Sequence, residues 1–202
     1  MKRGFTLLEI LAILFLLMII LGLTMIIINP YAYFQRARDF KRINDLRALE
    51  IALNTYINVT STPILAPSST NIGETNQSIF ISVPFDKEDK RNTLVEGFYI
   101  YQASSTNYLK IDGNGWMPVN FSSLNYPPLT VLPIDPINSY SKKYFYSYVA
   151  NSSQKIFEIN ANLESSIFKT DEGNDFTSTD GGDNPNIFEV GNNKNLMPNS
   201  LY

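Results

Sequence analysis

The first 28 residues constrain this chain more than any other stretch, because they contain a long apolar run with a single charged side chain. From Phe5 to Ile28 there are 24 residues, and Glu9 is the only ionisable one among them. About 20 apolar residues, at ~1.5 Å of rise each, span the ~30 Å hydrocarbon core of a bilayer. We therefore expect residues 5–28 to form a membrane-spanning helix.

Glu9 is the anomaly in this run. A charged side chain inside a spanning helix costs about 2.5–3.5 kcal/mol on insertion scales, so a residue of this kind is a candidate functional site. Two simpler interpretations stay open: a cleaved secretory signal peptide, and a plain single-pass anchor in which Glu9 reaches the nearby interface. The signal peptide is disfavoured because its apolar core spans ~7–15 residues. In addition, residues 29–33 contain no convincing A-x-A-like cleavage site.

The segment Lys2-Arg3-Gly4-Phe5-Thr6-Leu7-Leu8-Glu9 resembles the leader and mature N-terminus of type IV pilins and type II secretion pseudopilins. In that family a prepilin peptidase cuts after the glycine, the new first residue is N-methylated, and the Glu five residues into the mature chain serves assembly. The resemblance implies cleavage between Gly4 and Phe5, methylation of Phe5 and an assembly role for Glu9. A neighbouring subunit's Phe5 amino group would match the Glu9 charge in a filament, because a buried charge is tolerated when it is paired.

The resemblance also implies a location and a set of partners. It implies a precursor that crosses the cytoplasmic membrane once with its N-terminus inside, and a mature chain in an extracytoplasmic or cell-surface filament. The implied partners are further copies of this chain, the prepilin peptidase, and the platform protein and minor pilins of an assembly machine. Before assembly, the partner of the apolar run is the membrane itself.

The charges on the two flanks of the apolar run predict opposite orientations of this helix in the membrane. Lys2 and Arg3 suit a cytoplasmic N-terminus, but the opposite flank is more basic, and a count of loop charges alone reverses the orientation. That flank contains Arg36, Arg38, Lys41, Arg42 and Arg47. We follow the family resemblance and expect these cations on a solvated helix face, or against anionic headgroups and the carboxylates of neighbouring subunits.

The pattern of residues 29–59 predicts an amphipathic helix that continues the apolar helix. Apolar side chains recur at spacings of three and four and indicate one buried stripe, which consists of Phe40, Ile43, Leu46, Leu49, Leu53 and Tyr56. Polar residues, including Arg42 and Asp45, fill the other positions. Pro30 removes a backbone donor, so we expect the helix to bend or break near Ile28.

Residues 60–202 predict a β-rich head, which makes the expected fold class α+β. In this pilin-like arrangement the apolar half of a long N-terminal helix protrudes, and its second half packs against a small antiparallel sheet. Alternating apolar and β-branched runs predict strands over 78–83, 95–103, 108–111, 143–150 and 155–163, with the last two paired across residues 151–153. We expect residues 60–70 to form an exposed linker and the Pro-rich segment 115–136 an ordered loop packed on the head.

The C-terminal part of the head contains an acidic loop. Clustered carboxylates with Gly and Asn suit Ca²⁺, which takes six to eight oxygen ligands. Major pseudopilins resemble this in using a calcium-binding C-terminal loop where type IV pilins use a disulfide. The candidate ligands are Asp171, Asp175, Asp180 and Asp183, and the alternative is a plain acidic surface loop.

Composition excludes several function classes. The chain has no Cys and no His, so a disulfide, a thiolate or imidazole metal site and a Ser-His-Asp triad are impossible. Residues 60–202 contain nine Lys and Arg against fifteen Asp and Glu, a formal charge of −6, which disfavours nucleic-acid binding by the head.

These observations favour a structural subunit that needs no cofactor over an enzyme. The alternative is a monomeric, membrane-anchored ligand-binding domain. The Tyr stripe at positions 144, 146 and 148 is expected to pack in the core or at a subunit contact rather than to bind a ligand.

Overall fold

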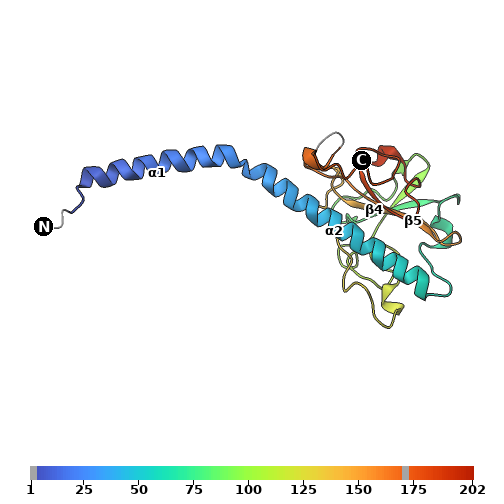
Figure 1. The fold of residues 1–202 in the computed structure, drawn as a ribbon. Helices are drawn as coiled ribbons and strands as arrows, with labels where there is room; N and C mark the ends of the chain where they lie inside the picture. Colours follow the sequence, from blue (N-terminus) through green and yellow to red (C-terminus); the bar gives the residue numbers. More distant parts are fainter. Residues whose placement is uncertain (1–3, 170–172) are drawn as a thin grey trace. The chain divides into compact units, whose positions relative to one another are not determined.

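The computed structural model describes residues 4–169 and 173–202 and divides the chain into two compact units, residues 1–37 and 38–202. Helix α1 (Leu7–Ile28) lies in the first unit. Helix α2 (Pro30–Val59) begins in the first unit and continues through the second, where it meets the sheet (Figure 1). The two expected helices are therefore present, with residues 4–6 outside the first one.

The two helices are separated by a single residue. Asn29 ends α1 in the left-handed region, with φ 43° and ψ 71°, and Pro30 begins α2. Proline suits the first position of a helix because the N–H that it lacks has no partner there. The interruption expected near Ile28 is thus found at Asn29.

Helix α1 is long and apolar enough, from Leu7 to Met25, to cross a membrane. Within its own unit, the large apolar side chains of this stretch stay exposed, from 45% at Ile19 to 77% at Leu8. A signal sequence near an N-terminus would have the same length and composition. What is established is a helix whose apolar surface, from Leu7 to Met25, has no cover within the first unit.

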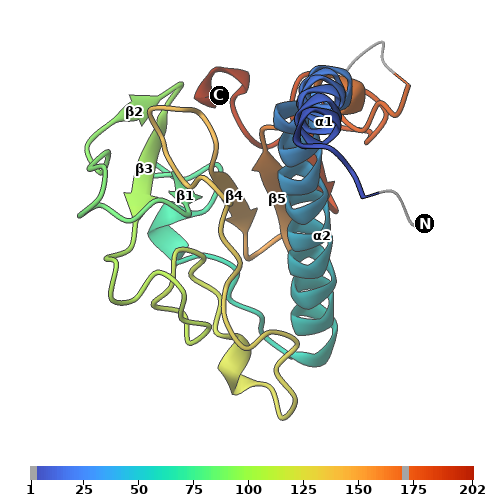
Figure 2. The ribbon, with the colours of Figure 1, turned by 90° about the vertical axis from the view of Figure 1, so that its left-hand side faces the viewer.

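The second unit is built on a six-stranded sheet with the order β2-β3-β1-β4-β5-β6 (Figure 2). The strands are β1 (Ser78–Ile81), β2 (Leu94–Val95), β3 (Phe98–Gln102), β4 (Tyr146–Asn151), β5 (Ile156–Ala161) and β6 (Phe188–Gly191). Together with the helices they give the expected α+β class. The predicted hairpin is confirmed, since β4 and β5 pair antiparallel from Tyr146 opposite Ala161 to Asn151 opposite Ile156.

Three strand predictions were wrong in detail. The sheet is not purely antiparallel, because β1 and β3 run parallel, joined by a connection that contains the short strand β2. The predicted strand 95–103 is split by a turn at Glu96 and Gly97, whose φ values of 46° and 88° suit a two-residue hairpin turn. Residues 108–111 form no strand, and β6 was not predicted.

The main core lies between α2 and one face of the sheet. Five of the six predicted stripe residues of α2 are buried there: Ile43, Leu46, Leu49, Leu53 and Tyr56. Phe40 was wrongly placed in the stripe, since it is 53% exposed and touches Phe168 edge to face. Asp39, Arg42 and Ala52 are buried in addition.

The long loop before β4 contributes to the same core, as the sequence predicted for residues 115–136. Its buried side chains are Trp116, Met117, Val119, Phe121 and Leu132. The linker prediction for residues 60–70 was only half right, because Leu65 and Ala66 are buried and their N–H groups donate to the Ser152 hydroxyl at 3.0 and 3.1 Å.

The tyrosines of β4 have packing roles. Tyr146 and Tyr148 face α2, and their hydroxyls donate to Asp45 at 2.8 Å and to the carbonyl of Leu65 at 3.0 Å. Phe145 and Val149 point to the opposite face, where the C-terminal segment covers them with Met197 and Leu201. The expected alternation along this strand is therefore correct.

Candidate functional site

The residues expected to undergo processing lie before the first helix. Gly4, Phe5 and Thr6 are non-helical and exposed, and α1 begins at Leu7. The peptide bond between Gly4 and Phe5 is therefore outside any helical hydrogen-bond ladder. An extended, accessible bond of this kind is the form in which a peptidase can engage a backbone.

Glu9 takes part in a capping box at the start of α1. Its Oε2 accepts hydrogen bonds from the Thr6 backbone N–H at 2.8 Å and from the Thr6 hydroxyl at 2.9 Å. The Glu9 N–H in turn donates to Thr6 Oγ1 at 3.2 Å. Within residues 4–169 and 173–202 no Lys or Arg forms an ion pair with Glu9. The polar contacts that the described residues make with the carboxylate are thus local, and none of them involves a cation.

The second unit contains a buried ion cluster, which we call the Arg42 cluster: Arg38, Asp39, Arg42, Asp135 and Glu164. The Arg42 side chain is 0% exposed and donates to three carboxylates. Its Nε and Nη2 reach Asp135 at 2.5 and 3.0 Å, and its Nη1 reaches Asp39 at 2.7 Å and Glu164 at 2.6 Å. The ring of Tyr144 lies 4.9 Å from the guanidinium carbon.

The carboxylates of the Arg42 cluster have further partners that join three parts of the chain. Arg38 donates twice to Glu164, at 2.7 and 2.5 Å, and the Asp39 carboxylate accepts the N–H groups of Glu164 and Ser165. Asp135 accepts the N–H groups of residues 137 and 138. The cluster therefore ties α2 to the loop before β4 and to the segment after β5.

Burial and ion pairing act against each other in the Arg42 cluster. Burial lowers the pKa of Arg42, but the hydrogen bonds and charge of Asp135 outweigh it, so the pKa lies above its ordinary value. Burial likewise favours a higher pKa for Glu164, yet the two arginines hold that pKa below its usual range. For Asp39, burial outweighs its hydrogen bonds and raises the pKa. Arg42 is thus charged at every pH that the fold survives.

This cluster corrects the expectation for the basic flank. Arg42 is buried rather than solvated, Arg38 pairs with Glu164, and Lys41 pairs with Asp45 at 2.5 Å. The signal in the sequence was periodicity: Asp39 and Arg42 precede Leu46 and Leu49 at spacings of three and four, which places them on the buried stripe. The prediction considered the charge of these two residues but not their position in the helical repeat.

The acidic loop gives no metal site within the residues that the structure describes. Asp171 lies outside them, and no group of three carboxylates suited to a metal is found in the rest. The Asp175 carboxylate accepts the N–H groups of Thr177 and Ser178, and Asp180 accepts those of Gly182 and Glu189. Asp183 is exposed. Calcium binding by this loop stays a prediction.

A buried carboxyl pair, which sequence reasoning missed, lies on β5 and β6. Glu158 and Glu189 are almost fully buried, and both accept from the Asn160 side-chain amide, at 2.7 and 3.2 Å. Burial raises the pKa of Glu189 to about 8, and the charges of Glu158, Asp180 and Asp183 act in the same direction. Burial also raises the pKa of Glu158, although two N–H groups of the C-terminal segment donate to it. Along β5, the polar residues Glu158 and Asn160 alternate with apolar ones. This alternation was the signal in the sequence that could have revealed the pair.

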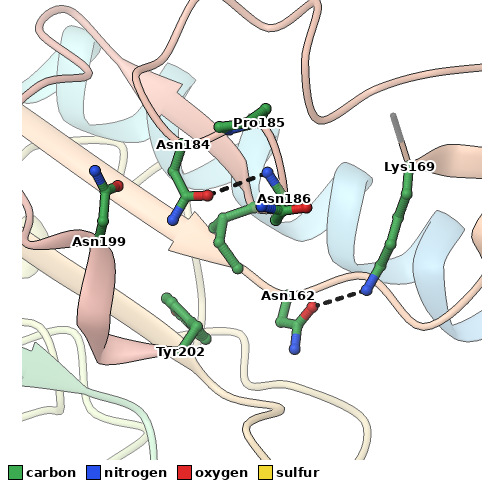
Figure 3. Close-up of a pocket in the computed structure, with 8 residues that line it drawn as sticks. Asn162, Lys169, Asn184, Pro185, Asn186, Asn199 and Tyr202 are labelled. Atoms are coloured by element: carbon green, nitrogen blue, oxygen red, sulfur yellow. Dashed lines mark hydrogen bonds between the residues drawn. The ribbon is translucent and has the colours of Figure 1, made fainter. Parts of the chain in front are cut away.

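An open, polar pocket of about 490 Å³ lies beside the C-terminal segment (Figure 3). Its lining is rich in side-chain amides and consists of Asn162, Lys169, Asn184, Pro185, Asn186, Ile187, Asn199 and Tyr202. Lys169 donates to Asn162 Oδ1 at 3.3 Å, and the Asn184 side chain accepts the N–H of Asn186 at 3.1 Å. These groups could hydrogen-bond a polar ligand, but none of them is a nucleophile paired with a base.

Comparison of the chain with protein-family models, with curated proteins and with solved structures gives no match in any of the three. The functional argument therefore rests on the residues and contacts described above.

Proposed function

We propose that this chain is the structural subunit of an extracytoplasmic filament, a pilin or major pseudopilin of a type IV pilus or a type II secretion-like system. In this proposal the chain is cleaved between Gly4 and Phe5 and polymerises through α1. The observation that carries it is the combination of an apolar helix, exposed within its own unit from Leu7 to Met25, with a carboxylate at its start that no described cation pairs. Both features favour a partner outside the chain.

Polymerisation would satisfy both needs at once. Packing α1 helices against one another removes apolar surface from lipid or water, and it brings the start of one helix near the start of the next. Cleavage before Phe5 creates an α-amino group four residues from Glu9, and methylation of that group keeps its positive charge. The amino group of a neighbouring copy can then pair with Glu9 in the apolar interior, where a lone carboxylate is costly.

The same residues suit the steps before assembly. The exposed, non-helical segment that contains Gly4 and Phe5 is accessible to a prepilin peptidase, and α1 can hold the precursor in the membrane. In the unassembled subunit the Glu9 carboxylate accepts two hydrogen bonds from Thr6. These bonds leave its negative charge in place, so pairing with a cation stays favourable.

The substitution Glu9→Ala tests the proposal. We expect the variant to enter the membrane as the wild type does, because it removes a charge from an apolar helix. We expect its filament yield to fall at least tenfold, since about 1.4 kcal/mol of lost pairing at each subunit contact already gives that factor. The yield is measured in a sheared extracellular fraction by electron microscopy and quantitative blotting.

The matched control is Glu74→Ala, which removes an exposed carboxylate from the head. It should leave the filament yield unchanged. A Glu9→Ala variant that assembles as well as this control would refute the pairing mechanism.

A membrane-anchored binding domain is the second candidate, and the amide-lined pocket is the observation that favours it. A chain with that function would not assemble, and it would be indifferent to Glu9. The Glu9→Ala experiment therefore separates the two candidates without knowledge of the ligand.

A further inference from the structure

The first turn of α2 carries three exposed aromatic side chains. Tyr31, Tyr33 and Phe34 are 66%, 68% and 60% exposed. They follow directly on the apolar helix, and they belong to the same compact unit as α1. Exposed aromatic rings at the end of an apolar helix are typical of the membrane–water interface, where an amphipathic ring is stabilised at the level of the headgroups.

The spacing along the chain fits this interface. Tyr31 and Phe34 come three and six residues after Ile28, the last residue of α1, which is ~5–9 Å at a rise of ~1.5 Å per residue. The headgroup layer on one side of a bilayer is ~5–8 Å deep, being half the difference between the full thickness and the hydrocarbon core. If α1 spans the core, these rings lie in that layer.

Arg36 adds a positive charge in the second turn of α2. It is exposed, and within the described residues no carboxylate forms an ion pair with it. Residues 4–37 contain a single carboxylate, Glu9, at the other end of α1. The neighbouring cations of the basic flank differ, since Arg38, Lys41 and Arg42 all pair with carboxylates.

The order along the chain is therefore an apolar helix, an aromatic girdle and then one cation without an acidic partner. We infer that Tyr31, Tyr33, Phe34 and Arg36, which we call the collar, bind anionic phospholipid headgroups at the membrane surface beyond Ile28. The guanidinium of Arg36 suits a phosphate because its planar fork donates two parallel hydrogen bonds. This inference rests on the membrane-spanning role of α1 in the proposed function, and it adds a lipid class as a partner of the unassembled subunit.

The effect of a single Arg is measurable. One Lys or Arg near an anionic surface contributes about 1 kcal/mol, which corresponds to about a fivefold preference for anionic over zwitterionic lipid. The aromatic rings are not expected to distinguish the two lipids, because they interact with the apolar boundary. They are expected to fix the depth of the collar instead.

The test uses the full chain in nanodiscs that contain phosphatidylcholine and phosphatidylglycerol at 3:1. Native mass spectrometry after partial delipidation gives the ratio of the two lipids retained by each subunit. We expect the ratio of phosphatidylglycerol to phosphatidylcholine among the retained lipids to be about five times the bulk ratio for the wild type. The enrichment should fall severalfold in Arg36→Gln, to what Lys2 and Arg3 at the other flank of α1 retain. It should be mostly retained in Arg36→Lys and unchanged in Lys110→Gln, which removes an exposed cation of the head. Equal enrichment in the wild type and in Arg36→Gln would overturn the inference.

A second measurement tests the depth of the girdle. The natural Trp116 is fully buried in the head, so its emission provides a constant background for a Tyr33→Trp reporter. We expect lipids brominated near the headgroup to quench the added emission more strongly than lipids brominated near the chain end. Equal quenching, or none, would contradict the placement of the collar.

The outcomes also separate this inference from the filament proposal. A chain that assembles normally but shows no lipid preference overturns the collar alone. A chain that shows the preference but never assembles overturns the filament alone, and a chain that does not remain in the nanodisc overturns both.

Discussion

Glu9 lies in the apolar run of α1 and Arg42 on the buried stripe of the amphipathic helix α2, and the chain provides for these two charges in opposite ways. Arg42 is fully buried in the head and donates to Asp39, Asp135 and Glu164. Glu9 is exposed on a helix whose apolar surface has no cover within its own unit from Leu7 to Met25, and among the described residues its carboxylate accepts hydrogen bonds from Thr6 alone. The head contains the partners of its buried charge, whereas the described part of the first unit contains no cation paired with Glu9.

This difference indicates where the charge of each unit finds its partner. A charge removed from water must be paired and hydrogen-bonded, or it is strongly destabilising. Where the pairing is internal, as at Arg42, the charge fixes the fold of one chain. Where no described residue pairs with the charge, as at Glu9, we propose a partner in another copy of the chain, which is the reasoning behind the proposed filament.

The largest expected effect comes from breaking the internal pairing. Arg42→Ala leaves Asp39 and Asp135 without their cation in a buried site and Glu164 with Arg38 alone. Removal of one partner of a buried pair costs about 3–5 kcal/mol. We expect a loss of this size in the free energy of unfolding of the head, measured by urea titration of the full chain in detergent. Arg91→Ala is the control, because Arg91 pairs with Asp89 at 2.8 Å on the surface and should cost under about 1 kcal/mol. Equal losses would mean that the Arg42 cluster is not what holds the head together.

An intermediate effect is expected from pH, acting on the carboxyl pair of Glu158 and Glu189. Burial raises the folded-state pKa of Glu189 to about 8 from an ordinary value of 4.5. Between pH 4.5 and pH 8 the folded chain therefore keeps a proton on Glu189 that the unfolded chain releases. Stability should therefore fall as the pH rises from about 4.5 to 8. Unfolding measured at pH 5.5 and pH 8.5 should show this loss in the wild type and a smaller one in Glu189→Gln. A variant with the same pH dependence as the wild type would exclude Glu189 as the cause.

The smallest effect is expected at Lys41, which sharpens the contrast with Arg42. Its ion pair with Asp45 is as short as any in the Arg42 cluster, at 2.5 Å, but its side chain is 53% exposed. Exposed pairs of this kind on a helix contribute about 0.3–0.5 kcal/mol. Lys41→Ala should therefore change the urea midpoint only slightly, and the remaining change should disappear in high salt. A loss comparable to that of Arg42→Ala would show that burial does not decide the strength of these pairs.

Local patterns predicted the parts of the fold that local forces determine. The apolar run from Phe5 to Ile28, the stripe from Ile43 to Tyr56 and the β4–β5 hairpin follow from periodicity and turn residues alone. The parallel pairing of β1 with β3 depends on how a connection crosses the sheet, which no short pattern encodes. Strand β6 has only four residues after a long Asn- and Asp-rich loop, so its signal is weak.

The candidate sites show the same division. Gly4, Phe5 and Glu9 were predicted as site residues from a contiguous motif, and in the structure they lie at an exposed helix start. The Arg42 cluster joins residues as much as 126 positions apart, so only the folded chain brings them together. The sequence predicted Arg42 to be solvated because its charge outweighed its position on the stripe. Two of the three carboxylates that reverse this outcome, Asp135 and Glu164, lie far along the chain.

The most direct test of the account is the intact mass and N-terminal sequence of the protein from a sheared extracellular fraction. The account predicts a chain that begins at Phe5 and carries one additional methyl group. A chain that retains residues 1–4 and is found only in membranes, in cells whose prepilin peptidase is shown to be active, would contradict it.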